Sequence, residues 1–138
     1  MWKAQYFSHS EMACKCGCGK AEMDQEFMNL LDSIRDLMGQ PLIITSGYRC
    51  PNHPAEKRKG AGNSGAHSKG KAADIAVMRE DAHKLLEVVA RFNDAARPAG
   101  VAYFTGIGIQ QKGAGRFIHL DTCTMADDGL PRPTIWSY

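Results

Sequence analysis

The sequence predicts an α+β domain with a mainly antiparallel central sheet flanked by helices. Three observations lead to this class: two stretches with the spacing of amphipathic helices, two short strand-like stretches, and a pair of apolar runs separated by a glycine-containing turn. The order strand, long loop, strand, helix and hairpin is typical of α+β domains. The 138 residues contain no internal repeat and no change in composition, so we expect a single domain over residues 1–138.

The first helix is expected over residues 23–38, where apolar side chains recur at steps of three and four and Gly39 ends the pattern. The apolar members of this stripe are Met23, Phe27, Leu30, Leu31, Ile34, Leu37 and Met38. Residues 41–46 form a short apolar, β-branched stretch, which predicts a buried strand that delivers Arg49 near its end.

The rest of the chain alternates between long connections and regular elements. Residues 50–70 are polar and rich in glycine and proline, and a loop of this length in a compact domain usually has a function. A short strand is expected at residues 72–77 and a second amphipathic helix at about residues 80–92. The apolar runs at residues 107–109 and 117–120 predict a hairpin.

Charge and hydropathy exclude several classes of partner. The 17 basic and 15 acidic side chains give a net charge of +2, far from the basic stripe of a protein that binds nucleic acid through phosphates. No apolar run is long enough for a membrane span, and the first residues lack the pattern of a secretory signal. We therefore expect no nucleic acid partner and synthesis in the cytoplasm without a signal peptide. We also expect a monomer.

Two phosphate-loop patterns overlap in the long loop, and both are incomplete. Residues 60–65 match GxGxxG, but they follow a charged stretch where the motif needs a strand. Residues 65–71 resemble a Walker A loop, yet Ala72 stands where a magnesium-binding Ser or Thr is required. Nucleotide binding at this segment is kept only as a minor alternative.

His67, Asp74 and His119 are the candidate metal ligands. Three nitrogen or oxygen ligands are what a catalytic zinc uses while one position stays open for water. An aspartate inside an apolar strand is costly unless a cation or a partner stabilises its charge. His119 and Asp121 share a face of the last predicted strand. From the residues alone, a hydrogen-bonded core histidine and an Asp74–Arg49 ion pair remain open.

The five cysteines do not form an evident disulfide framework. Cys14, Cys16 and Cys18 are crowded together, whereas Cys50 and Cys123 are distant in sequence. The Cys-x-Cys-x-Cys spacing lacks the usual pairing of structural zinc sites, which favours free thiols or a local disulfide over a metal site.

These motifs, taken in order, resemble the zinc D-Ala-D-Ala carboxypeptidase and endopeptidase family, whose fold is shared with the signalling domain of Hedgehog proteins. The similarity covers most of the chain and is greatest with the short, single-domain branch found in bacteriophages and prophages. The matching segments are Ser46-Gly47-Tyr48-Arg49, His67-x-x-Gly70-x-Ala72-Ala73-Asp74 and Phe117-Ile118-His119-x-Asp121, with Cys14-x-Cys16-Gly17-Cys18-Gly19 before them and Trp136 after them.

The resemblance implies that His67, Asp74 and His119 bind one zinc ion and that Arg49 faces the substrate. Many relatives place an acidic general base three residues before the last histidine ligand, where this chain has Arg116. Asp121 is therefore the candidate base, although it could equally orient a ligand.

The implied function is a zinc metallopeptidase that cleaves an amide bond in peptidoglycan stem peptides or cross-links. The resemblance also suggests a phage or prophage lysin, or a virion-associated hydrolase, acting at the bacterial cell wall. The alternative is a non-catalytic zinc-binding structural or interaction module on the same fold.

Overall fold

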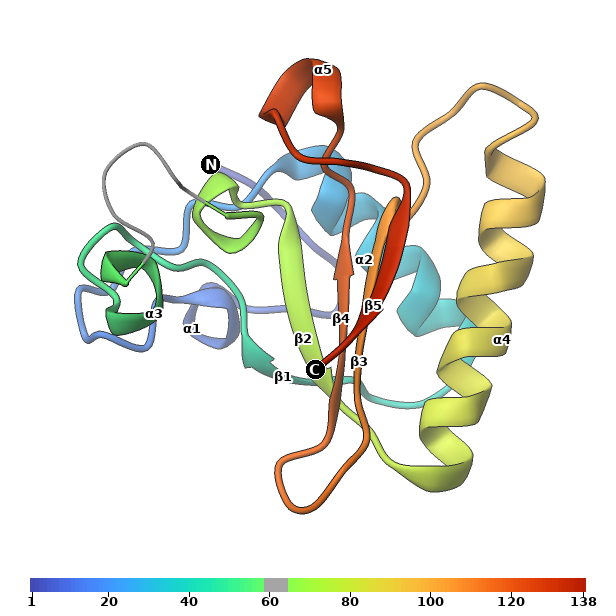
Figure 1. Ribbon diagram of the computed structural model, residues 1–138, viewed down its shortest axis with the longest axis horizontal. Coiled ribbons are helices and arrows are strands. Elements are labelled where there is room, and N and C mark those ends of the chain that lie inside the picture. Colours follow the sequence, from blue (N-terminus) through green and yellow to red (C-terminus); the bar gives the residue numbers. More distant parts are fainter. Residues whose placement is uncertain (59–64) are drawn as a thin grey trace.

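The computed structural model describes residues 1–58 and 65–138 (Figure 1). Residues 59–64, which hold most of the GxGxxG match, lie outside the described part of the chain. Five strands form one sheet in the order β1-β2-β4-β3-β5, with every neighbouring pair antiparallel except β3 and β5. The predicted α+β class with a mainly antiparallel sheet is confirmed. The strands are β1 (Ile43–Ser46), β2 (Ala72–Ala76), β3 (Gly106–Gln110), β4 (Phe117–Asp121) and β5 (Thr134–Ser137).

In the described part of the chain, two long helices and four short ones accompany the sheet. They are α1 (His9–Met12), α2 (Gln25–Met38), α3 (Pro54–Lys57), the 3₁₀-helix η1 (His67–Lys69), α4 (Arg79–Ala96) and α5 (Met125–Asp128). Helix α2 starts two residues later than predicted because the Asp24 carboxylate accepts a hydrogen bond from the backbone N–H of Phe27 at 2.9 Å and caps the helix. It ends at Gly39, which has a left-handed φ of 69°.

The core lies between one face of the sheet and the long helices. Figure 1 shows α2 behind the sheet and α4 along its side. Strand residues alternate between the two faces, and one set is fully buried against the helices: Ala73, Ile75, Ile118 and Leu120. Their helical partners in the same apolar cluster include Phe27, Leu31, Ile34, Leu85 and Val89.

Two predictions of burial are wrong. Leu37 of the α2 stripe is 56% exposed, because the face toward the sheet is already occupied by Leu31, Ile34 and Met38. Ile43 is 65% exposed because β1 is an edge strand, so only alternate residues such as Ile44 face the core.

The other face of the sheet carries a row of residues that crosses all five strands. Ser46 of β1 pairs with Asp74 of β2, and Asp74 pairs with His119 of β4. His119 in turn pairs with Gly108 of β3, which pairs with Trp136 of β5. The sheet register thus brings residues from distant parts of the sequence side by side.

Within the described residues, we find no helix with the length and apolar character needed to cross a membrane.

Candidate metal centre

His67, Asp74 and His119 converge on a single point. The Oδ1 atom of Asp74 lies 3.2 Å from Nε2 of His67 and 3.0 Å from Nδ1 of His119. The two imidazole rings meet edge to face with their centroids 5.1 Å apart. All three residues are buried, and one ligand atom from each lies within 4.8 Å of the others. The three sequence-predicted ligands are therefore brought together by the fold.

Backbone geometry explains why the three side chains meet. Asp74 and His119 are directly opposed in the β2–β4 pairing. His67 begins η1, and its Nδ1 is hydrogen-bonded to the carbonyl oxygen of Gly47 at 2.7 Å, which turns Nε2 toward Asp74. Gly70 ends η1 with a φ of 70°, and a Cβ there would lie 2.1 Å from the carbonyl oxygen of Glu22. Only glycine fits this tight approach between the His67 loop and the segment before α2.

The spacing of the ligand atoms fits a tetrahedral ion. Zinc binds nitrogen and oxygen ligands at about 2.0–2.1 Å, so ligand atoms in a tetrahedral site lie about 3.3 Å apart. The two measured separations from Asp74 Oδ1 are close to this value. Two imidazoles and one carboxylate are also a donor set that zinc accepts. The group could therefore hold a metal ion.

Burial and mutual contact shift the pKa values of the three groups in different directions. Burial lowers the pKa of His67, because the charged imidazolium loses hydration. Burial alone would also lower the pKa of His119, but hydrogen bonds to Asp121 and Asp74 outweigh it and raise that pKa. For Asp74, burial would raise the pKa, and the hydrogen bonds with His119 and His67 instead hold it well below its usual range. The Asp74 carboxylate is therefore ionised and can bind a cation.

Asp121 lies on the opposite side of the His119 ring from Asp74. Its Oδ2 is 2.7 Å from Nε2 of His119, and its side chain is fully buried. Arg132 donates from Nε to Oδ1 at 2.9 Å and from Nη2 to Oδ2 at 2.7 Å, and the backbone N–H of Cys123 donates to Oδ1 at 3.2 Å. Burial would raise the pKa of Asp121, but the contacts with His119 and Arg132 lower it to about 2. Asp121 is therefore an ionised acceptor at neutral pH, and it lies behind the candidate ligand His119.

Arg49, which follows β1, approaches Asp74. Its Nη2 lies 3.4 Å from Oδ2 of Asp74, and its Nε donates to Oγ of Ser46 at 3.1 Å. A longer contact of 3.9 Å joins Nη1 to Oε2 of the buried Glu56. The Arg49 side chain remains 20% exposed, so part of its guanidinium faces the space above the ligands.

Trp136 covers the outer side of His119. The two ring centroids are 5.1 Å apart, and the guanidinium of Arg132 lies 5.1 Å from the indole. Gly108 makes room for this arrangement, because a Cβ at that position would lie 2.7 Å from the indole Nε1. Gly106 makes room for Asp121 in the same way, because a Cβ on Gly106 would lie 2.3 Å from the carboxylate oxygens of Asp121. The two glycines of β3 therefore leave the space that the Trp136 indole and the Asp121 carboxylate occupy.

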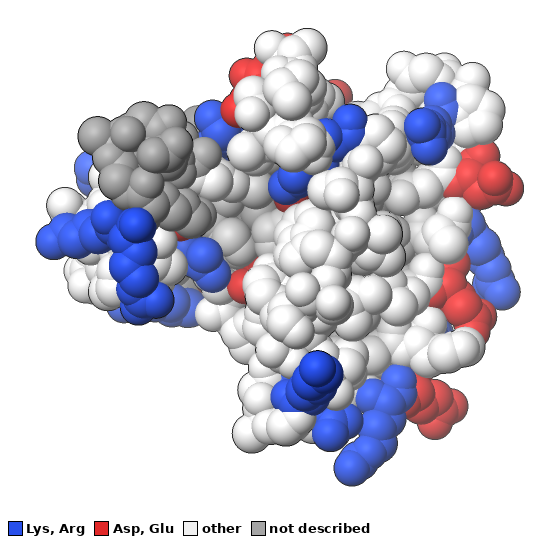
Figure 2. Space-filling model, viewed as in Figure 1, with Lys and Arg blue, Asp and Glu red and all other residues white. Residues whose placement is uncertain are grey.

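An open pocket of about 340 Å³ lies over the three ligands. Figure 2 shows this face hollowed between the region around α3 and the strand β5. Two guanidinium groups and several apolar side chains surround the ligands: Arg49, Arg132, Phe117, Leu130, Trp136 and Tyr138. A volume of this size accommodates a short piece of a peptide.

The other histidines lie away from this pocket. His9 stacks on Trp2 with a centroid distance of 4.0 Å, His53 caps α3, and the exposed His83 pairs with Glu87. Arg116, at the position where relatives have an acidic residue, donates to the carbonyl oxygen of Gly113 within the β3–β4 hairpin. Lys71, the lysine of the Walker-like pattern, is bound to Asp128 at 3.0 Å.

Sequence reasoning did not identify Arg132, Leu130 or Tyr138 as part of the site. Arg132 precedes β5, and its contact with Asp121 depends on the parallel pairing of β3 and β5, which has no local sequence pattern. Trp136 was the one residue of this region that the sequence indicated, because it belongs to the segments that resemble the peptidase family.

A comparison with known families decides the assignment. A family model described as Peptidase M15 matches residues 5–121. The chain belongs to the peptidase M15 family. The M15 match includes the three candidate ligands, Arg49 and Asp121, whereas Arg132 and Trp136 follow it. M15 peptidases are zinc-dependent, in agreement with the donor set described above. Searches of curated proteins and of solved structures gave no match.

Proposed function

We propose that this M15 protein is a zinc peptidase that hydrolyses an amide bond in the peptide stems or cross-links of bacterial peptidoglycan. The observation that carries the proposal is the convergence of His67, Asp74 and His119 beneath an open pocket lined by Arg49 and Arg132. Three ligands of this kind leave one coordination position free, which distinguishes a catalytic from a closed structural zinc site.

The metal ligands are His67 through Nε2, Asp74 through its carboxylate and His119 through Nδ1. A zinc ion bound there supplies Lewis-acid chemistry that activates water and polarises an amide carbonyl. The Gly47 carbonyl oxygen fixes His67 by accepting from Nδ1–H, so Nε2 keeps a free lone pair.

Asp121 orients His119. Both of its oxygens already accept hydrogen bonds, and its fully buried side chain is separated from the pocket by the His119 ring. An ionised Asp121 keeps the proton of His119 on Nε2, which leaves the Nδ1 lone pair facing Asp74. Of the two roles open to Asp121 from the sequence, this geometry supports the positioning role over that of general base.

Arg49 binds the substrate. Its guanidinium is held in place by Ser46 and Asp74 and is partly exposed to the pocket. A fixed planar donor of this kind stabilises the negative charge that develops on the carbonyl oxygen of the scissile amide, or binds a peptide carboxylate. Arg132 adds a second guanidinium on the other side of the pocket.

The chemistry of the pocket suits peptidoglycan stems. These peptides are short and carry free carboxylates, which match the partly exposed guanidinium of Arg49 beside an apolar wall. We further propose that the protein is made in the cytoplasm and reaches the wall as a phage or prophage lysin, or as part of a virion. The support for this context is the similarity of its motifs to the short phage-type branch.

The test is hydrolysis of purified peptidoglycan and of defined stem peptides, followed by mass spectrometry of the released fragments. We expect new amino termini that disappear with a zinc chelator and with His67→Ala, but persist in His83→Ala, the matched exposed histidine. Release of free alanine from a stem peptide would identify a carboxypeptidase, whereas opening of a cross-linked dimer would identify an endopeptidase.

A second candidate function is a non-catalytic zinc module on the same fold. The observation that favours it is that Asp74 is the only Asp or Glu among the described residues that line the pocket. Intact peptidoglycan together with stoichiometric, His67-dependent zinc binding would establish this function in place of the peptidase.

A further inference from the structure

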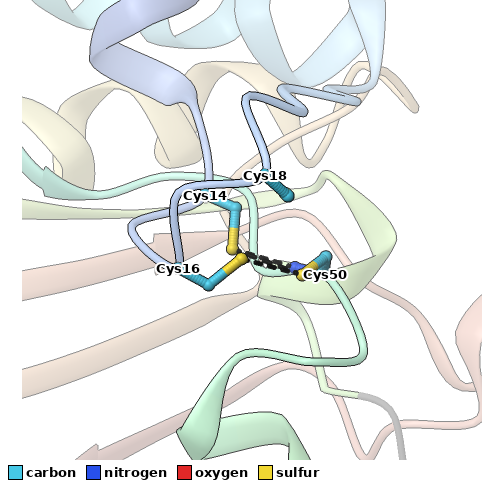
Figure 3. A group of neighbouring side chains, drawn as sticks. All are labelled: Cys14, Cys16, Cys18 and Cys50. Atoms are coloured by element: carbon cyan, nitrogen blue, oxygen red, sulfur yellow. Dashed lines mark hydrogen bonds between the residues drawn. The ribbon is translucent and has the colours of Figure 1, made fainter.

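The fold brings together four cysteines that are separated in the sequence. Cys14, Cys16 and Cys18 lie in the loop after α1, and Cys50 follows β1 and Arg49 (Figure 3). The Sγ of Cys50 lies 3.6 Å from that of Cys14 and 3.3 Å from that of Cys16. The four sulfur atoms all lie within 4.8 Å of one another. Because Cys50 contacts two sulfurs at once, the cluster is not a simple pair of thiols.

The sulfur spacing fits one tetrahedral metal ion. Zinc binds cysteine sulfur at about 2.3 Å, so sulfurs in a tetrahedral site lie about 3.8 Å apart. The two measured separations, 3.6 and 3.3 Å, are slightly shorter than this value, and the four sulfurs all lie within 4.8 Å of one another. An iron–sulfur cluster would place several iron ions and sulfides between the cysteines and would need a wider spacing. Four thiolates around a single centre match a closed structural zinc site.

The backbone supports the cluster on both sides. The N–H of Cys50 donates to Sγ of Cys14 at 3.3 Å, the kind of contact that stabilises a metal-bound thiolate. The N–H of Cys14 donates to the carbonyl oxygen of Lys20 at 2.8 Å, which closes the loop. Gly17 and Gly19 have φ values of 93° and 75°, and these left-handed conformations let the loop fold back between its cysteines.

The burial of the cysteines and the charge of their loop also suit a metal site. Cys14 and Cys50 are buried, whereas Cys16 and Cys18 are exposed, so an ion can enter from solvent. A divalent ion with four thiolates has a net negative charge, and the loop that carries three of the cysteines also carries two exposed lysines, Lys15 and Lys20.

We propose that Cys14, Cys16, Cys18 and Cys50 bind a second zinc ion, in a structural site separate from the His67–Asp74–His119 centre. This site was not expected from the Cys-x-Cys-x-Cys spacing, because its fourth ligand comes from another segment.

The second site fastens the N-terminal segment to the strand that presents Arg49. The N–H of Tyr48 donates to the carbonyl oxygen of Met12 at 2.9 Å, and a Cβ on Gly47 would lie 2.8 Å from that same oxygen. Gly47 also accepts the hydrogen bond from His67. The segment from Gly47 to Cys50 therefore contacts the cysteine cluster at one end and the His67 ligand at the other.

The test is the zinc content of protein produced in zinc-supplemented medium and purified under reducing conditions. Native mass spectrometry and elemental analysis should give two zinc ions per chain and no iron. Cys16→Ser and Cys18→Ser, which alter exposed positions, should each lose one zinc and retain the other. Cys123→Ser, which alters a buried cysteine outside the cluster, should keep both, and circular dichroism verifies that each variant is folded.

Cobalt substitution identifies the ligands independently of activity. The wild type and His67→Ala should show a thiolate-to-cobalt charge-transfer band, and Cys16→Ser should lose or strongly weaken it. Equal zinc content in the wild type and in folded Cys16→Ser would overturn the proposal, as would iron at the cysteines. A mass lower by two hydrogens with a single zinc bound would overturn it in favour of a disulfide. Loss of peptidase activity with two zinc ions still bound would count against the proposed peptidase function and not against the cysteine site. The two proposals can therefore be overturned independently of each other.

Discussion

The Nε2 of His119 and the Oδ2 of Asp121 lie 2.7 Å apart on one face of β4, with Arg132 bound to the far side of the carboxylate. If Asp121 orients His119, Asp121→Asn should weaken zinc binding by about 10–100-fold, because the charged acceptor that fixes the ring is lost. Competition with a chromophoric chelator measures the zinc affinity, and the exposed Asp94→Asn is the control. Unchanged zinc affinity together with lost turnover would instead assign the general base role to Asp121.

Arg49 should be required for turnover and not for zinc binding. In Arg49→Lys the charge remains, but the planar fork held by Ser46 and Asp74 is lost, so kcat/KM should fall by about 10²–10³-fold. Zinc content should stay at the wild-type level. Arg97→Lys, at the end of α4, is the control. Full activity in Arg49→Lys would show that only a positive charge is needed there.

Gly108 should be intolerant of any side chain. The Cβ of Gly108→Ala would lie 2.7 Å from the Trp136 indole, so the indole must leave His119 and we expect a destabilisation of about 1–3 kcal/mol. Chemical denaturation measures this free energy. The double variant Gly108→Ala/Trp136→Ala should be less destabilised than the sum of the two single variants, since the clash is removed. Additive effects would mean that the two residues are not in conflict.

The Lys71–Asp128 pair predicts a pH-dependent contribution to stability. Burial would raise the pKa of Asp128, but hydrogen bonds from the Thr124 N–H and the Lys71 ammonium lower it. The folded state therefore favours the ionised carboxylate, and this stability is complete above the unfolded pKa of about 4 and is lost as the pH falls below it. Burial would lower the pKa of Lys71, yet Asp128 raises it, so the lysine keeps its charge up to strongly alkaline pH.

Asp128→Asn should accordingly cost about 1–2 kcal/mol at pH 7, and the difference from wild type should shrink as the pH falls toward 2. Thermal unfolding at a series of pH values measures both quantities, with Asp127→Asn on the same short helix as control. A difference that is constant with pH would show that the charge of Asp128 is not involved.

The sequence was sufficient for elements and candidate ligands whose signals are local. Helix α2 follows from its apolar period and its terminal glycine, and Asp74 and His119 were found because a charged or polar side chain inside an apolar strand needs a partner. Strand β5 was missed because it is short, largely exposed and paired in parallel with β3 across a long connection.

The same reason explains the missed side chains. Arg132 donates a hydrogen bond to Asp121, and the sulfur of Cys50 contacts that of Cys16, which precedes α2. Both contacts join segments that are distant in the sequence. Arg49 could be placed near the site from its motif, whereas its hydrogen bond to Ser46 required the geometry of β1.

The row of paired residues that runs from Ser46 through Asp74, His119 and Gly108 to Trp136 makes the proposed zinc site a property of the completed sheet. His67, Asp74 and His119 are scattered in an unfolded chain and become neighbours only when β2 and β4 have paired. Zinc should therefore bind the native state far more tightly than the denatured one and raise the unfolding temperature in proportion to the logarithm of its free concentration. Zinc uptake would thus report that β2 and β4 have paired in the native register, and a chain with misaligned strands would be distinguishable by its failure to retain the ion.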